Sequence, residues 1–142
     1  RNDLSKICKT GSVKIDKLKK VEEYRDLFHY VTTIKGVIKN KMSNHDIISS
    51  LMPGGSVIGC PKISTIQLLN RKEKFDRNIY TGSFGIIHSN GDMRFNIMIR
   101  TLLNFKNDIE LSVASGVILG STAKKEYNEN YIKAKSLLDL FN

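Results

Sequence analysis

The strongest turn signal in the chain is Pro53-Gly54-Gly55-Ser56-Val57-Ile58-Gly59-Cys60-Pro61-Lys62, which holds both prolines of the sequence. Proline and glycine interrupt regular structure, so this stretch predicts a loop that divides the chain. Pro61 suits the first turn of a helix, which we expect to run to about Lys74. Glycine N–H groups beside a helix start can approach an anion closely. The loop lacks the Gly-Lys-Ser/Thr ending of a P-loop, and an ordinary loop explains the same residues.

Upstream of this loop the sequence predicts two strands and a short helix. Residues 13–21 and 28–38 are β-like, and the second run is rich in Val, Ile and Thr. Ser43 is placed as the N-cap of a helix over residues 44–51.

Downstream of the loop we expect an antiparallel meander followed by a helix. Strands are predicted at 79–87, 93–105 and 109–119, with an Asn-Gly hairpin signal between the first two. The segment 123–141 has apolar residues at helical spacing. The predicted class is therefore α+β, with antiparallel sheet layers flanked by helices. The apolar stripe of the last helix comprises Ala123, Tyr127, Tyr131, Ala134, Leu138 and Phe141.

The amino-acid composition predicts a single domain that binds neither nucleic acid nor a membrane. The 142 residues suffice for one domain. The net charge is +9, but the basic residues are scattered and do not alternate with aromatic residues, so we expect no nucleic-acid partner. Cys8 and Cys60 form neither a metal motif nor a disulfide framework, which indicates a reducing, cytoplasmic setting. No apolar run approaches the roughly 18 residues of a membrane span, so we expect no membrane partner.

Three residues of the last predicted helix could act together. Glu126, Glu129 and Lys133 fall within about 60° of one another around a helix axis. Carboxylates one turn apart can share a hard cation such as Mg²⁺. A solvated face in which Glu129 pairs with Lys133 explains the same spacing.

Other polar residues are weaker candidates. Arg100 lies on the polar face of a predicted strand and could clamp a carboxylate, although an exposed strand arginine is commoner. His29 and Tyr80 could be functional or simply packed.

Six segments occur in an order that resembles the C-terminal half of the chorismate-binding enzymes, which include anthranilate synthase component I, aminodeoxychorismate synthase component I and the isochorismate and salicylate synthases. The resemblance covers essentially the whole chain, which we expect to be a C-terminal fragment (1–142) of an anthranilate synthase-like domain whose N-terminal half is missing. The segments are Arg1-Asn2-Asp3-Leu4, His29-Tyr30-Val31-Thr32, Pro53 to Lys62, Tyr80-Thr81-Gly82-Ser83, Asn96 to Thr101, and Glu126-Tyr127-Asn128-Glu129 with Lys133.

The resemblance implies a role for each matching residue. Glu129 with Glu126 would form the acidic end of a Mg²⁺ site that meets the ring carboxylate of chorismate, and Lys133 would meet the same carboxylate. The other substrate contacts would come from Arg100 and Tyr80 at the enolpyruvyl carboxylate, the N–H of Gly116, and Ser56 near the ring, with His29 as the catalytic residue at the reacting side.

Two motifs resemble the aminodeoxychorismate synthases more than the anthranilate synthases: Pro53 to Val57 and Tyr80 to Ser83. That branch implies conversion of chorismate and ammonia to 4-amino-4-deoxychorismate for folate synthesis, with a glutamine amidotransferase subunit as partner. Anthranilate synthase component I, of tryptophan synthesis, and a non-catalytic chorismate-binding module are the alternatives.

The sequence also departs from the family pattern. Residues 114–116 and 120–123, Ile58 and Asn130 differ from the usual residues. The family's nucleophilic lysine and a further metal-binding glutamate would precede Arg1. We therefore expect this chain alone to be inactive, and expect self-association through faces that pack against the missing half.

Overall fold

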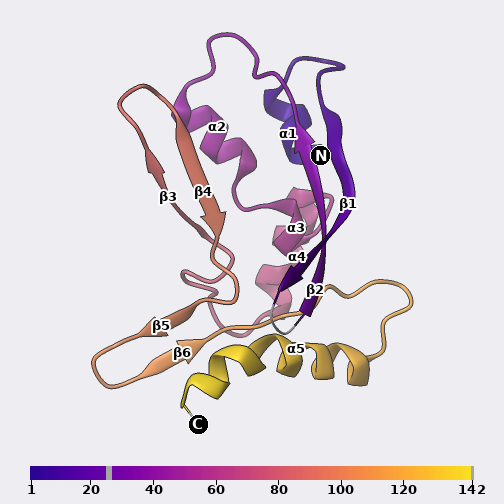
Figure 1. Ribbon diagram of the computed structural model, residues 1–142, viewed down its shortest axis with the longest axis vertical. Helices are drawn as coiled ribbons and strands as arrows, with labels where there is room; N and C mark the ends of the chain where they lie inside the picture. The colour runs from indigo at the N-terminus through magenta and orange to yellow at the C-terminus, as the bar shows by residue number, and fades with distance from the viewer. Residues whose placement is uncertain (25–26, 142) are drawn as a thin grey trace. The chain divides into compact units, whose positions relative to one another are not determined.

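The computed structural model describes residues 1–24 and 27–141 and consists of two compact units (Figure 1). Unit 1 comprises Arg1–Lys72 with His88–Asp92, and unit 2 comprises Glu73–Ile87 with Met93–Asn142. Both contain helices and two-stranded antiparallel sheets, which confirms the predicted α+β class.

In its described residues, unit 1 contains one hairpin and four helices. The strands predicted at 13–21 and 28–38 pair antiparallel, and Figure 1 shows them as one long twisted hairpin. The residues that join the two strands lie outside the described part of the chain. The elements are α1 (Asn2–Ile7), β1 (Lys14–Tyr24), β2 (Leu27–Lys35), α2 (Asn44–Leu51), α3 (Gly55–Ile58) and α4 (Lys62–Lys72).

Local sequence signals explain α2 and α4. Ser43 caps α2 as predicted: its hydroxyl accepts the N–H of Asp46 at 3.1 Å, and the Asp46 carboxylate accepts the N–H of Ser43 at 3.1 Å. This reciprocal pair satisfies two donors at the helix start. Helix α4 begins just after Pro61 and ends at Lys72, close to the predicted limit. Helices α1 and α3 were not predicted, because both are too short to show an apolar period.

The core of unit 1 forms where its helices meet. Four apolar side chains are buried there: Ile7 and Cys8 at the end of α1, Ile47 in α2 and Ile58 in α3. The end of α1 is tied to the chain after β2 by an antiparallel bridge between Cys8 and Ile38. The helices that flank the glycine-rich loop thus share one small core.

Among the described residues, unit 2 contains the paired strands of two hairpins and the C-terminal helix, whereas the turn of the first hairpin, His88–Asp92, belongs to unit 1. The predicted turn at Asn90 and Gly91 joins the first pair of strands, with Gly91 in the left-handed region at φ +90°. Glycine takes this conformation without a steric penalty. The elements are β3 (Ser83–Ile87), β4 (Met93–Ile97), β5 (Leu102–Asn104), β6 (Ile109–Leu111), α5 (Ala123–Leu138) and the 3₁₀ helix η1 (Asp139–Phe141).

The predicted three-stranded meander is wrong. The strand expected over 93–105 is broken after Ile97, and β5 pairs only with β6. The chain bends at Arg100, whose φ is +50°, and the N–H of Ile99 bonds the carbonyl of Ile97 at 2.9 Å. A bend of this kind ends a ladder, because the next N–H groups no longer face the neighbouring strand.

Helix α5 does not bury its predicted apolar stripe. Tyr127 and Tyr131 are 75% and 64% exposed, and only Ala134 of the stripe is buried. The covered side instead carries Glu126, Asn130 and Lys133, which are half-buried. Among the described residues, no helix is both long enough and apolar enough to cross a bilayer.

We expect the chain to self-associate, because large apolar side chains are exposed in both units. Phe28 and Tyr30 of β2 are 68% and 72% exposed, and Phe84 of β3 is 71% exposed. Exposed apolar surface of this extent favours association in water. Sedimentation velocity over a hundredfold range of concentration should show a rising average mass, and a single monomer mass at all concentrations would contradict this expectation.

Candidate functional site

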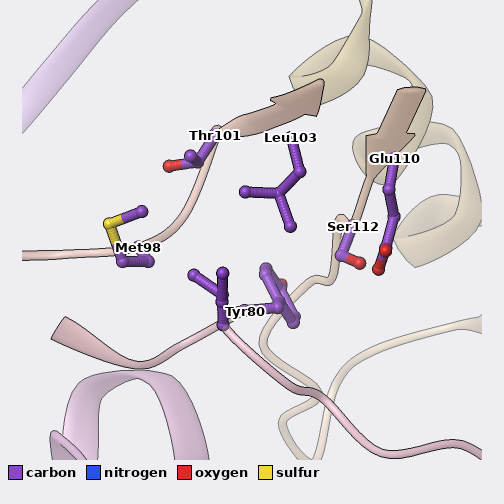
Figure 2. Close-up of a pocket in the computed structure, with 7 residues that line it drawn as sticks. Tyr80, Met98, Thr101, Leu103, Glu110 and Ser112 are labelled. Carbon is purple, nitrogen blue, oxygen red and sulfur yellow. The ribbon is translucent and has the colours of Figure 1, made fainter. Parts of the chain in front are cut away.

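Tyr80 lines a small cavity in unit 2. Figure 2 shows its side chain facing the same space as Met98, Thr101 and Leu103, with Glu110 and Ser112 on the β6 side. The space available to the centres of water-sized molecules is about 10 Å³, enough for roughly one water. Pockets for small organic ligands are of the order of hundreds of Å³. This cavity therefore cannot enclose a substrate of chorismate's size.

An arginine holds the Tyr80 ring. The guanidinium carbon of Arg77 lies 5.9 Å from the ring centre, within the range of a cation–π contact. Arg77 is itself fixed by two hydrogen bonds to Glu73, Nε to Oε2 at 2.8 Å and Nη2 to Oε1 at 2.5 Å. Burial raises the pKa of the Tyr80 hydroxyl, so the group remains a neutral donor at physiological pH.

The structure brings together two of the motif segments. The N–H of Thr81 bonds the carbonyl of Met98 at 2.9 Å, and the N–H of Met98 bonds the carbonyl of Gly82 at 3.0 Å. The turn that carries Tyr80 therefore lies against the bend that carries Arg100.

Both sides of this junction have unusual backbone angles. Asn78, Thr81 and Arg100 have φ of +47°, +64° and +50°. Such angles are costly for a β-branched residue, and Thr81 is nevertheless buried. Arg100 is exposed at a bend, not on the strand face where it was predicted. Its guanidinium forms no ion pair with the described residues.

Glu129 and Lys133 form an ion pair on α5. The Glu129 Oε1 atom lies 2.6 Å from the Lys133 Nζ atom, which also donates to the carbonyl of Ala114 at 3.3 Å. An ammonium group has three N–H donors, so one donor remains for a further acceptor. Glu129 and Lys133 therefore form the ion pair that their i, i+4 spacing allows. The Lys133 side chain also contacts the segment that leads to Gly116, through the carbonyl of Ala114.

Glu126 faces this same segment. Hydrogen bonds from the hydroxyls of Ser121 and Ser115 lower the pKa of Glu126 against the opposing effect of burial, and the charge of Lys133 adds a smaller lowering. Its Oε2 atom and the Oδ1 atom of Asn130 are shielded from solvent yet meet no hydrogen-bond donor in good geometry. Buried oxygens of this kind are unusual and fit an additional positive or donor group.

The described residues fit a hard cation only in part. Two carboxylates on successive turns, Glu126 and Glu129, suit Mg²⁺, which binds through one or two carboxylates and keeps several waters. Within 1–24 and 27–141, no three His, Cys, Asp or Glu side chains are grouped so that they could hold a metal ion.

Gly116 lies in the irregular segment between β6 and α5. It is exposed, and a Cβ atom added there would meet nothing within 4 Å. Its N–H takes part in no backbone hydrogen bond with the described residues, so it is available to an external acceptor.

The remaining predicted residues, His29 and Ser56, belong to unit 1. His29 is exposed on β2, opposite Glu22, and its ring meets the Tyr24 ring edge-on at 6.5 Å. Ser56 is exposed in α3, next to Gly55. The two residues lie on different elements and share no hydrogen bond.

The structure also reveals an ion pair that sequence reasoning missed. The Lys62 Nζ atom lies 2.8 Å from the Asp3 Oδ1 atom, and the two side chains are 9% and 20% exposed. Both residues stand in motif segments, but nothing in the local sequence indicates that they pair.

The pKa of Asp3 reflects this environment. Burial by itself would raise the pKa of the carboxyl, but hydrogen bonds from Lys62 and the Gly55 N–H, with the charges of Lys62 and Lys6, lower it below its ordinary value of 3.8.

Comparison with known proteins gives one family. The family model described as chorismate binding enzyme matches residues 1–139. The chain is 36% identical over 138 residues to an anthranilate synthase component I-like protein of Synechocystis, and 34% identical over 134 residues to aminodeoxychorismate synthase component 1 of Bacillus subtilis. These alignments cover 97% and 94% of this chain, but 28% of each relative. The chain therefore spans less than a third of the length of these relatives.

A solved structure agrees with this result. The crystal structure of anthranilate synthase component I from Streptococcus pneumoniae has a TM-score of 0.79 to this chain at 32% identity. The match covers 96% of this chain and 31% of that one. The family predicted from the motif segments is thus confirmed.

Replacing Asp3 by asparagine should reveal the ion pair through the pH dependence of stability. Since folding lowers the pKa of Asp3, its contribution is complete above pH 3.8 and is lost as pH falls through the folded-state pKa. We expect Asp3→Asn to lower the free energy of unfolding by about 3 kcal/mol at pH 7, the low end for a broken buried pair. The deficit relative to the unmodified chain should shrink below about pH 4.

Urea unfolding at pH 7, 5, 3.5 and 2.5 would measure this difference. Asp16→Asn is the matched control, because the Asp16–Lys35 pair is exposed and ion pairs of this kind contribute little to stability. A deficit for Asp3→Asn that stayed the same at every pH would show that the carboxylate charge is not its cause.

Proposed function

Because the chain belongs to the chorismate-binding enzyme family, we propose that it forms the C-terminal part of aminodeoxychorismate synthase component I. The intact protein would replace the C4 hydroxyl of chorismate with ammonia and release water. The observation that carries the family-level part of this proposal is the match over residues 1–139. Relatives of both branches have similar sequence identity to this chain. The aminodeoxychorismate branch is therefore proposed from the residues of the two motifs at 53–57 and 80–83.

Unit 2 would supply the groups that bind the anionic parts of the substrate. Chorismate carries two carboxylates, and anions of this kind are held best by several fixed donors and cations. We propose that Lys133 uses its remaining N–H for the ring carboxylate. The enolpyruvyl carboxylate would be held by Arg100, the hydroxyl of Tyr80 and the N–H of Gly116.

The acidic end of a Mg²⁺ site would come from Glu126 and Glu129. Mg²⁺, when bound, would act as a Lewis acid that assists departure of the hydroxyl. The serine hydroxyls beside Glu126 favour its ionised form, which is the form that binds a cation. Lys133 neutralises Glu129 in the absence of a cation and fixes its orientation.

The resemblance would also place Ser56 near the ring and make His29 the catalytic residue at the reacting side. Ammonia would come from glutamine through a separate amidotransferase subunit, in keeping with the "component" names of the relatives. A reducing, cytoplasmic setting fits the free thiols of Cys8 and Cys60.

Two alternatives remain within the family. Anthranilate synthase component I is supported by the relative from Synechocystis and by the solved structure from Streptococcus pneumoniae. A non-catalytic chorismate-binding module is favoured by the departures at residues 114–116 and 120–123, which adjoin Glu126.

Chorismate binding should depend on Mg²⁺ and on the carboxylates of α5. We expect Glu126→Gln and Glu129→Gln each to weaken Mg²⁺-dependent binding by about tenfold or more, because each removes a ligand charge. Isothermal titration of the 142-residue chain with chorismate, with and without Mg²⁺, measures the effect directly.

Asp139→Asn is the matched control for that titration. Asp139 pairs with Lys135 at 2.6 Å with the same spacing as Glu129 with Lys133, but lies at the far end of α5. Equal losses in all three variants would indicate a general effect of charge and would count against a site at Glu126 and Glu129.

The product of the intact protein would identify the branch. With chorismate, an ammonium salt and Mg²⁺, we expect the longer protein that contains this sequence to form 4-amino-4-deoxychorismate, detected by mass spectrometry. Anthranilate with pyruvate would assign the protein to the other branch. The 142-residue chain alone should show no turnover, because the family's nucleophilic lysine has no counterpart in it. Steady conversion of chorismate by this chain would overturn that expectation.

A further inference from the structure

Lys62 is not placed to bind substrate directly, because its ammonium group is buried against three protein oxygens. Its Nζ atom lies 2.8 Å from Asp3 Oδ1 and donates to the carbonyls of Ser50 at 3.1 Å and Leu51 at 3.3 Å. The ammonium group is therefore engaged by one ion pair and two hydrogen bonds. The side chain is also 9% exposed. This contrasts with Lys133, which keeps one donor.

The acceptors of Lys62 come from two helices. Asp3 lies in the first turn of α1, while Ser50 and Leu51 end α2. A cation is favourable at a helix C-terminus, where the carbonyls have no partner within the helix. Lys62 itself begins α4. One buried charge therefore fixes the positions of three helices around the glycine-rich loop.

The second oxygen of Asp3 holds the other end of this loop. The N–H of Gly55 donates to Asp3 Oδ2 at 2.8 Å. A Cβ atom at Gly55 would lie 3.0 Å from the Cys60 sulfur and 3.2 Å from Asp3 Oδ2, so a larger residue would require these side chains to shift by a few tenths of an ångström. The Asp3 carboxylate thus bridges Gly55 at the start of α3 and Lys62 at the start of α4.

Ser56 is the residue next to this bridge. It follows Gly55 in α3 and is exposed, so its position depends on the anchored N–H of Gly55. We infer that Asp3 and Lys62 are positioning residues, whose ion pair holds the glycine-rich loop so that Ser56 is presented to the substrate. This inference rests on the proposed function, because it takes Ser56 to contact the chorismate ring.

Two measurements on the 142-residue chain test this inference: amide chemical shifts and the affinity for chorismate. In ¹H–¹⁵N spectra, Asp3→Asn and Lys62→Met should shift the amide signals of Gly55 and Ser56. In titrations with chorismate and Mg²⁺, both variants should bind about tenfold more weakly, as expected when a contact group is displaced by a fraction of an ångström to 1 Å. Asp16→Asn, which breaks an exposed ion pair in the same unit, should change neither reading.

A further variant covers the case in which loss of the ion pair unfolds the chain. Gly55→Ala leaves both charges in place but crowds the Asp3 carboxylate and the Cys60 sulfur, so we expect it to disturb the contact between the loop and Asp3. It should move the Ser56 amide signal and weaken chorismate binding to a similar extent, while the spectrum outside the loop is retained. Wild-type affinity in Gly55→Ala together with a displaced loop would overturn the inference.

Ser56→Ala separates this inference from the proposed function. If Ser56→Ala weakens binding but Asp3→Asn and Lys62→Met, still folded, do not, the positioning role is wrong and the proposed site stands. If Ser56→Ala binds chorismate normally while Glu126→Gln does not, the inference is also overturned, because Ser56 is then no contact. If none of these variants changes binding, the proposed site itself is wrong.

Discussion

The ammonium group of Lys62 imposes the strongest constraint on unit 1. A charge so little exposed is costly unless every donor has a partner and a counter-charge lies close by. Those conditions are met only when α1 supplies Asp3 and the end of α2 supplies two carbonyls. The apolar core, formed by Ile7, Cys8, Ile47 and Ile58, comes from the same helices. Charge pairing and apolar packing therefore require the same arrangement, and the glycine-rich loop is held within it.

Helix α5 of unit 2 covers its polar side and exposes apolar residues. Its tyrosines face solvent, and its covered side carries Glu126, Asn130 and Lys133. Covering polar groups is unfavourable unless they find partners. Lys133 has two partners, but the Glu126 Oε2 and Asn130 Oδ1 atoms have no hydrogen bond. The covered side of α5 is therefore polar, and two of its oxygens lack a hydrogen-bond partner among the described residues.

The junction of Tyr80 and Arg100 shows a similar departure from the most stable arrangement. Left-handed angles at Asn78, Thr81 and Arg100 cost backbone free energy, of the order of 1 kcal/mol or more each. They persist because the Thr81 and Met98 backbones bond each other and Arg77 fixes the Tyr80 ring. Sequence patterns could not predict this junction, since alternation along 93–105 treats Arg100 as an ordinary strand residue. The consecutive apolar residues Ile97, Met98 and Ile99, and again Leu102 and Leu103, are local signs that the alternation breaks in this segment.

The sequence by itself determined the features that depend on near neighbours. Ser43 with Asp46 defines the start of α2, and Asn90 with Gly91 defines a hairpin, because both signals act over a few residues of backbone. The order of the motif segments was enough to identify the family. Tertiary structure alone decided the Asp3–Lys62 pair, the end of β4 at Ile97 and the side of α5 that is covered. Each of these depends on atoms brought together from distant parts of the chain, and no local periodicity records such contacts.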